Sequence, residues 1–257
     1  MLKATNNRMK LSINKSIKIA KEAAMLAGKS LLNKKKDFHK VILSTDKDIK
    51  LQADLKAEEI IKDFLTSNSN IEILAEESGL SSDSLPEFFW VVDPLDGTAN
   101  YARDIPICCV SIALVTRLKP ILGVIYDFNN DDLYEGSIET KSLCNEKEIK
   151  VSNIASSSEG ILITGLPNDT DYSDDALQKM IKDFQSWRKI RMMGSAAMAS
   201  AYIASGKAEA YTEKKTYLWD VAAGAAIVNA AGGKAVISNQ NNKFQVDVLF
   251  TNSSIEI

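Results

Sequence analysis

Two aspartates stand three residues apart in the segment "WVVDPLDGTAN", residues 90–100, directly after a run of apolar residues. Asp93 and Asp96 are separated by Pro94 and Leu95. An ordinary explanation exists, because aspartate favours turns and is a good N-cap at the start of a helix. The alternative is a metal site, in which one tight turn presents both carboxylates to the same pocket. The other acidic residues of the chain bear on this choice.

Three further acidic residues fall at the expected ends of elements. Asp54 and Asp220 stand where helices are expected to begin, and Glu76 follows an expected strand. Singly, each is explained as a helix cap or as a solvated loop charge. Together, converging carboxylates would repel one another and acquire raised pKa values unless cations neutralised them. Oxygen ligands without histidine or cysteine suit a hard ion such as Mg²⁺.

The only histidine of the chain restricts the chemistry further. His39 lies in the lysine-rich segment "KKKDFHK", and we expect it at the surface. A Ser-His-Asp triad and a histidine-rich zinc site are therefore both excluded.

These acids must be positioned by an alternation of helices and strands. Apolar residues at steps of three and four predict amphipathic helices over residues 11–32 and 54–65. Short runs rich in β-branched and aromatic residues predict strands over 71–74, 88–92, 108–115 and 121–126, with a hairpin turn at 127–132. In the second half we expect strands over 160–164 and 208–212 and helices over 174–186, 194–205 and 219–233. The class is mixed α and β, with helix layers that cover sheets.

Composition and charge exclude several functional classes. The 257 residues carry a net charge of −3, so no basic field exists for nucleic acid or for an anionic membrane. The three cysteines include the adjacent Cys108 and Cys109 and show no CxxC spacing, which argues against a zinc cluster and favours reduced thiols. Neither a signal peptide nor a membrane-spanning apolar run is found, and we expect a cytoplasmic protein.

Three segments together resemble the signatures of the inositol monophosphatase family. They are "ILAEESG", "WVVDPLDGTANY" and "LWDVAAGAAIVNAAGG", and "RMMGSAAMASAYIASGKAEAYTEK" is similar to the family's substrate-pocket helix and strand. The resemblance implies a layered α-β-α-β-α sandwich of the inositol monophosphatase and fructose-1,6-bisphosphatase type. It implies a single domain over 1–257, with an N-terminal lobe to about residue 145 and a C-terminal lobe from about 146. The implied activity is Mg²⁺-dependent, lithium-sensitive hydrolysis of phosphomonoesters by a homodimer.

The resemblance also implies roles for individual residues. Glu76, Asp93 and the Leu95 carbonyl would hold one Mg²⁺. Asp93, Asp96 and Asp220 would hold a second ion, and Glu76 would also bind a weaker third. Gly97 and Thr98 would bind the phosphate, while Asp54 and Thr98, with Glu76, would activate the attacking water. The substrate would contact Asp96, Gly194, Ser195, Glu213 and Asp220.

Several alternatives stay open at this point. Glu213 is also explained as a solvated charge beside Lys214 and Lys215. The best single substrate is inositol 1-phosphate, and the rivals are 3′(2′),5′-bisphosphate nucleotides, fructose 1,6-bisphosphate, histidinol phosphate and NADP. A nucleotide would need an apolar or aromatic shelf, which the sequence does not place. A non-catalytic relative that binds a metal or a partner protein is the rival from another class.

Overall fold

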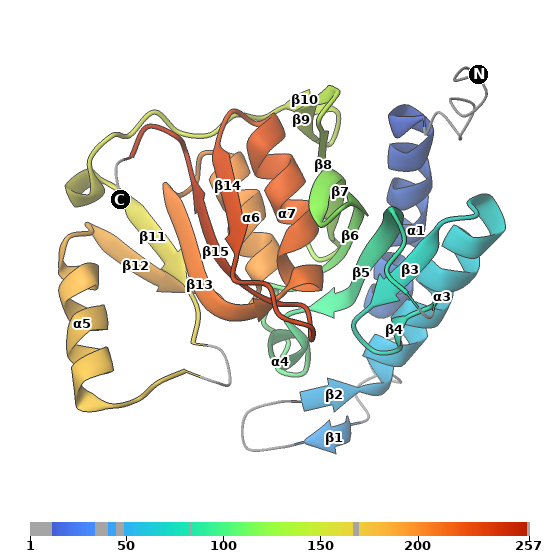
Figure 1. Ribbon diagram of the computed structural model, residues 1–257, viewed down its shortest axis with the longest axis horizontal. Helices are drawn as coiled ribbons and strands as arrows, with labels where there is room; N and C mark the ends of the chain where they lie inside the picture. The colour runs from blue at the N-terminus through green and yellow to red at the C-terminus, as the bar shows by residue number, and fades with distance from the viewer. Residues whose placement is uncertain (1–11, 34–40, 45–48, 83, 167–169, 256–257) are drawn as a thin grey trace, which may run out of the picture.

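The computed structural model describes residues 12–33, 41–44, 49–82, 84–166 and 170–255. These residues form two large β-sheets with helices between them and on both outer sides (Figure 1). The position predicted for His39 lies outside the described residues. No helix in the described ranges is long and apolar enough to cross a bilayer.

The first sheet has eight strands in the order β10-β9-β8-β7-β6-β5-β3-β4. Only the β3–β5 pair in it is parallel. Its strands are β3 (Glu72–Ala75), β4 (Gly79–Leu80), β5 (Phe88–Asp96), β6 (Cys109–Thr116), β7 (Lys119–Asp127), β8 (Asp132–Ser137), β9 (Thr140–Cys144) and β10 (Lys147–Glu148). A separate antiparallel pair, β1 (Val41–Ser44) and β2 (Ile49–Leu51), precedes helix α3.

The second sheet has five strands in the order β12-β11-β13-β15-β14. They are β11 (Ile161–Thr164), β12 (Lys189–Met192), β13 (Ala210–Tyr217), β14 (Lys234–Ser238) and β15 (Gln245–Thr251). Strand β11 runs parallel to both β12 and β13. The carboxyl ends of these three strands therefore lie at one edge of the sheet, where residues that follow the strands can meet.

The helices complete a five-layer sandwich (Figure 1). Helices α1 (Ile13–Asn33) and α3 (Gln52–Asn68) cover the outer face of the first sheet, and α5 (Asp174–Gln185) lies outside the second. Helices α6 (Ala196–Ala204) and α7 (Leu218–Ala230) lie between the two sheets. One turn each is formed by α4 (Thr98–Tyr101) and the 3₁₀ helix η1 (Ser157–Glu159). The layered α-β-α-β-α class predicted from the sequence is confirmed.

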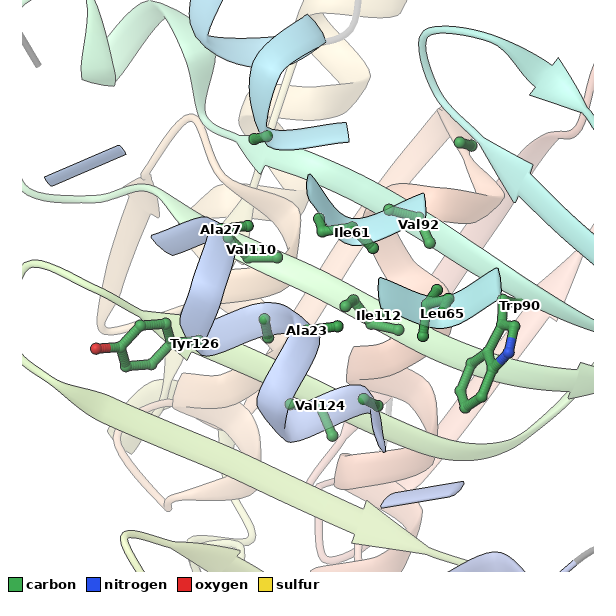
Figure 2. Close-up of a cluster of buried hydrophobic side chains, with 14 of the residues drawn as sticks. Ala23, Ala27, Ile61, Leu65, Trp90, Val92, Val110, Ile112, Val124 and Tyr126 are labelled. Atoms are coloured by element: carbon green, nitrogen blue, oxygen red, sulfur yellow. The ribbon is translucent and has the colours of Figure 1, made fainter. Parts of the chain in front are cut away.

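The periodic apolar residues of α1 and α3 form the core on the outer side of the first sheet. Figure 2 shows Ala23 and Ala27 of α1 beside Ile61 and Leu65 of α3, over strand residues such as Val92. Removing a large apolar side chain from water contributes about 1.5–3 kcal/mol, so this face fixes both helices on the sheet.

Leu55 is an apolar residue of α3 that does not join the core. Its side chain is 43% exposed. The helix instead buries Ala53, Ala57, Ile61 and Leu65, which recur at steps of four and so share one face.

Helix α7 is apolar on all sides because a sheet or helix covers nearly every face. It contacts β6, β7 and β8 of the first sheet, β14 and β15 of the second, and helix α6. Small residues permit this crowding: a Cβ at Gly224 would lie 2.2 Å from the Cβ of Ser200 in α6. Such a helix shows no amphipathic period, and the prediction of a helix over residues 219–233 rested on the glycines that end this segment.

The strand predicted over residues 88–92 was too short. Strand β5 continues through Pro94 to Asp96, with an irregular register against β6 between Asp93 and Asp96. A proline inside a strand is tolerated at such an irregularity, where the ladder hydrogen bond is already lost. The two aspartates are therefore held on a distorted strand end rather than on a free turn.

Candidate active site

A cavity of about 270 Å³ lies where β5 and the starts of α4, α6 and α7 meet. Five acidic side chains line it: Glu76, Asp93, Asp96, Glu213 and Asp220. Among its lining residues that the structure describes, there is no lysine, arginine or histidine. A site so uniformly acidic requires a cation from elsewhere to offset the repulsion.

Asp93 is fixed by the backbone that follows it. Its side chain is 2% exposed, and its Oδ1 accepts a hydrogen bond of 3.0 Å from the Leu95 N–H. Burial raises the pKa of Asp93 well above its ordinary value, and the charges of Glu76 and Asp96 raise it further. The carboxyl group is thus held in place, but its ionisation is unfavourable without a nearby positive charge.

Gly97 allows the chain to turn from β5 into α4. Its φ is +89°, in the left-handed region, and a Cβ there would lie 2.7 Å from the Ile107 carbonyl oxygen. Only glycine fits this combination without strain. The helix expected to begin here has just four residues, Thr98–Tyr101. An anion at this turn would therefore meet individual backbone N–H groups rather than the end of a long helix.

Asp54 reaches the cavity through Thr98. The Thr98 hydroxyl lies 2.8 Å from Asp54 Oδ1 and 3.0 Å from the Leu95 carbonyl oxygen, and it can donate to either. Asp54 is 2% exposed, and its second oxygen accepts a 2.7 Å hydrogen bond from the Leu51 N–H at the start of α3. With its proton directed to Asp54, Thr98 Oγ1 presents lone pairs that accept a hydrogen bond from water.

Asp96 does not cap the helix that follows it in the chain. Its carboxylate instead accepts hydrogen bonds from Ser195 Oγ at 2.5 Å and from the Ala197 N–H at 2.7 Å, at the start of α6. Burial raises the pKa of Asp96, and these donors partly oppose the effect. The N-cap explanation for Asp96 is therefore corrected: it serves the start of a helix about a hundred residues away.

Asp220 has a local helix role and also lines the cavity. It is the third residue of α7, and its Oδ2 accepts hydrogen bonds from Thr216 Oγ1 at 2.6 Å and from the Tyr217 N–H at 2.9 Å. Burial, followed by the charge of Asp96, raises its pKa to about 7. Capping and cation binding are thus compatible roles at this position.

Glu213 lies in the cavity wall rather than on a free surface. Its Oε2 accepts a 2.9 Å hydrogen bond from the buried Tyr211 hydroxyl, and burial raises its pKa to about 7. A Cβ at Gly165 would lie 2.3 Å from that same oxygen, so the glycine makes room for the carboxyl group. The alternative of a fully solvated charge does not describe this side chain.

Gly194 and Ser195 line the opposite wall of the cavity. Gly194 has a φ of +70°, and Ser195 caps α6 by accepting a hydrogen bond from the Met198 N–H at 3.2 Å. Asn100, which the sequence interpretation missed, donates to the Met193 and Ile107 carbonyl oxygens, both at 2.8 Å. These hydrogen bonds connect the segment between β5 and β6 with the start of α6. The local sequence around Asn100 does not predict them.

Glu76 stands at the open mouth of the cavity. Its side chain is exposed overall, yet protein atoms crowd its carboxyl group and, with the charge of Asp220, raise its pKa well above the ordinary value. Glu58 fixes the adjoining turn, because its Oε2 accepts a 2.9 Å hydrogen bond from the Glu77 N–H. The sequence interpretation missed Glu58, although it stands four residues after Asp54 and thus on the same face of α3.

The donor set fits a hard divalent cation chemically. Carboxylates and the Leu95 carbonyl line the cavity, and oxygen ligands of this kind suit Mg²⁺. Within the described ranges, no three His, Cys, Asp or Glu side chains stand as a finished coordination shell. Asp96 and Asp220 also accept hydrogen bonds from protein donors, and each carboxylate has further lone pairs that could bind a cation.

Comparison with known proteins identifies the family to which the chain belongs. Residues 11–255 match the model of the inositol monophosphatase family. The Nus factor SuhB of Xylella fastidiosa is 37% identical over 223 residues, which cover 85% of this chain and 80% of that protein. The inositol-1-monophosphatase of Synechocystis sp. is 33% identical over 229 residues, covering 84% and 77%.

A solved structure gives the same result for the fold. The inositol monophosphatase from Anabaena (Nostoc) sp. PCC 7120 superposes with a TM-score of 0.81 and 31% identity, covering 94% of this chain and 92% of that one. Matches over nearly the whole of both chains leave no room for a different architecture. The chain belongs to the inositol monophosphatase family, whose members are phosphomonoesterases that act on small phosphate esters and are generally metal-dependent.

Proposed function

We propose that this protein hydrolyses a small polyol phosphomonoester, with inositol 1-phosphate as the first candidate, in a Mg²⁺-dependent reaction. One observation carries the proposal: five carboxylates line a single cavity whose described lining residues include no cationic side chain. Such a cavity rejects a phosphate ester unless cations accompany it. Family membership indicates the class of reaction, and the acidic cavity supports the location proposed for the active site.

Glu76, Asp93 and the Leu95 carbonyl would hold one ion, and Asp93, Asp96 and Asp220 a second. Glu76 would also contact a third, weaker ion. Bound Mg²⁺ neutralises the acids, polarises the ester and lowers the pKa of water.

Asp54 and Thr98 would orient the attacking water. The Thr98 hydroxyl donates a hydrogen bond to Asp54, and its oxygen can then accept a hydrogen bond from the water. Asp54 is buried and held by the Leu51 N–H, so it cannot turn away from Thr98 without losing that bond. A fixed acceptor of this kind is what a general base requires.

Gly97 and Thr98 would bind the phosphate through their backbone N–H groups. The left-handed conformation of Gly97 turns the chain at this point, and the absence of a side chain allows phosphate oxygens to come close to the backbone.

The leaving group would lie against Glu213, Gly194 and Ser195, beside Asp96 and Asp220. A carboxylate accepts hydrogen bonds from two neighbouring hydroxyls, which favours a polyol at Glu213. We further propose, on family membership alone, a cytoplasmic homodimer that lithium inhibits.

The experiment is phosphate release from a panel of esters with Mg²⁺, with and without Li⁺. The panel contains inositol 1-phosphate, 3′-phosphoadenosine 5′-phosphate, fructose 1,6-bisphosphate, histidinol phosphate and NADP. We expect inositol 1-phosphate to be preferred and all activity to stop on chelation. Activity that survives chelation contradicts the metal assignment, and silence on every ester supports the non-catalytic alternative.

Thr98 provides the sharper test of the proposed mechanism. Thr98→Val removes the hydroxyl and is expected to lower kcat by about 10²-fold or more, the usual contribution of general base catalysis. Thr98→Ser keeps the hydroxyl and is the matched control, with kcat within about tenfold of wild type. Equal losses in both variants would contradict a role for Oγ1.

A further inference from the structure

Three polar side chains at steps of four residues lie along one face of helix α3. They are Asp54, Glu58 and Lys62. Asp54 accepts the hydrogen bond from Thr98 that the proposed mechanism uses. The mechanism gives the other two no role, although Glu58 is only 4% exposed and a carboxylate is rarely buried without a partner. The groups that Glu58 and Lys62 bind therefore indicate what else this face of α3 does.

Both side chains bind the turn that follows β3. Glu58 Oε2 accepts a 2.9 Å hydrogen bond from the Glu77 N–H. Lys62 Nζ donates a 2.7 Å hydrogen bond to Ser78 Oγ and lies 3.8 Å from the other carboxylate oxygen of Glu58. Lys62 therefore lowers the cost of burying the Glu58 charge and holds the turn at a second point. The residue directly before these two contacts is Glu76.

Glu76 differs from the other proposed cation ligands in how it is held. Its side chain is exposed overall, whereas Asp93 and Asp96 are 2% and 8% exposed. Its own N–H donates a 3.1 Å hydrogen bond to the Val92 carbonyl oxygen, on the strand that carries both aspartates. The next N–H along the chain is held by Glu58. The backbone of Glu76 is thus fixed on both sides, while its side chain extends from a turn.

A fixed backbone matters most for a ligand whose side chain is exposed. A glutamate on a loosely held turn loses more conformational freedom when it binds an ion, and this loss weakens binding. Groups that orient a ligand without touching the ion commonly change metal affinity by about 10–100-fold when they are removed. Glu58 is not among the residues that line the cavity, so its effect on a cation passes through the turn that carries Glu76.

We propose that Glu58 is a positioning residue that raises the affinity of the site for the cation at Glu76, acting through the Glu77 N–H. Lys62 supports it by offsetting its charge and by binding Ser78. One face of α3 thus positions both the acid that activates water and a ligand of the cation. The inference rests on the proposed function, because it requires a cation at Glu76.

Two substitutions of Glu58 separate the hydrogen bond from the charge. Glu58→Gln removes the charge and keeps a side-chain oxygen that can accept from the Glu77 N–H. Glu58→Asp keeps the charge but shortens the side chain by one methylene, which withdraws the acceptor. Glu59→Asp is the matched control, because the Glu59 side chain is 58% exposed and pairs with Lys56 of the same helix. Isothermal titration calorimetry measures the Kd for Mg²⁺ without substrate, and thermal melts in chelator report the stability of the fold.

We expect Glu58→Asp to raise the Kd for Mg²⁺ about tenfold or more, and Glu58→Gln to keep it within about threefold of wild type. Glu59→Asp should not change it. Saturating Mg²⁺ should return the kcat of Glu58→Asp to within about threefold of wild type, because no reacting group is lost. A merely structural role would lower the Tm in chelator and leave the Kd unchanged.

The failure of this inference differs from the failure of the proposed function. If the wild type binds Mg²⁺ and Glu58→Asp binds it equally well, the inference fails alone. Equal rises of the Kd in Glu58→Asp and Glu58→Gln would also overturn it, since the charge and not the hydrogen bond would then matter. If the wild type neither binds Mg²⁺ nor hydrolyses any ester, the proposed function fails, and the inference fails with it.

Discussion

Asp54, Asp96 and Asp220 each accept a hydrogen bond at the start of a helix, and all three lie in or beside the candidate active site. Asp54 binds the N–H before α3, Asp96 binds the N–H groups that begin α6, and Asp220 binds the N–H before α7. Helix starts are partly positive, so the bonds at Asp96 and Asp220 stabilise the ionised carboxylates, which burial disfavours. The site thus uses helix ends to keep its acids ionisable until a cation arrives.

Asp93 holds no helix start, so its replacement should impair the reaction without destabilising a helix. We expect Asp93→Asn to lower kcat by about 100-fold or more, because the charge shared by both proposed ions is lost. The asparagine Oδ1 can still accept from the Leu95 N–H. Without metal, the Tm should therefore stay the same or rise, as repulsion in the cavity falls. Phosphate release and a thermal melt measure the two effects.

Asp127→Asn is the matched control for this variant. Asp127 is also 2% exposed and hydrogen-bonded to nearby backbone, but it lies outside the cavity lining. Its replacement should leave kcat within about twofold, since no reacting group is touched. A comparable loss of kcat in both variants would mean that burial, not the cavity, explains the effect.

At the scale of elements, the distorted end of β5 positions the reacting groups. The irregular register between Asp93 and Asp96, followed by the left-handed Gly97, directs successive carboxylates and N–H groups to one side. Neighbouring elements hold the surrounding turns: Glu58 in α3 fixes the Glu77 backbone, and Asn100 fixes the Met193 carbonyl.

Gly97→Ala should lower the free energy of unfolding by more than the cost of placing alanine in a left-handed conformation. The new Cβ would lie 2.7 Å from the Ile107 carbonyl oxygen, a backbone atom that cannot move alone. Gly79→Ala is the control, because Gly79 has a φ of +73° and nothing within 4 Å of the new Cβ. We expect Gly79→Ala to cost about 1 kcal/mol of unfolding free energy and Gly97→Ala about 1–3 kcal/mol more. Urea unfolding measures both, and equal costs would contradict the crowding argument.

At the scale of the whole molecule, the cavity joins the two sheets. Glu76 and the β5 aspartates come from the first sheet, and Glu213 and Asp220 come from β13 and α7. Repulsion among these acids acts between the two sheets, and a bound cation would draw them together. Metal binding should therefore be visible as a change in the stability of the entire fold.

The pH dependence of stability without metal follows from the raised pKa values. The pKa of Asp220 rises from 3.8 to about 7 on folding, so between these values the folded state binds more protons than the unfolded state. The contribution of Asp220 to stability is therefore fully present below about pH 4, falls as pH rises toward about 7, and levels off above it. Melts in chelator from pH 5 to pH 8 should show a falling Tm, and Asp220→Asn should flatten the trend.

Mg²⁺ should reverse this loss. At pH 8 Glu213 and Asp220 are above their pKa values of about 7, and saturating Mg²⁺ should raise the Tm by several degrees, since it binds the folded state alone. K⁺ at matched ionic strength separates this effect from simple screening. A Tm at pH 8 that responds equally to both salts would contradict a specific site.

The sequence by itself determined the local features. Helices α1 and α3, the strands around Trp90 and Val110, and the position of each acid at the end of an element follow from periodicity and turn chemistry. Strands β1, β2, β4, β8, β9, β10, β12, β14 and β15 were not among those predicted. Most of them are short and carry little hydrophobic signal, whereas β15 alternates the buried Val246, Val248 and Phe250 with half-buried residues and could have been predicted from that period. Family resemblance named the acidic residues, which local pattern alone left as possible caps.

Only the tertiary structure decided which of these groups meet. Asp54 and its hydrogen-bond partner Thr98 are 44 positions apart in the sequence. Asp96 accepts a hydrogen bond from the N–H of Ala197, which is 101 positions away. The contacts of Glu58 and Asn100 also depend on packing between elements that are distant in the sequence. Local periodicity reports which face of an element is apolar, but not which elements share an edge. The acidic residues can therefore be identified from the sequence, whereas the cavity that they line forms only because α6 and α7 are packed between two sheets.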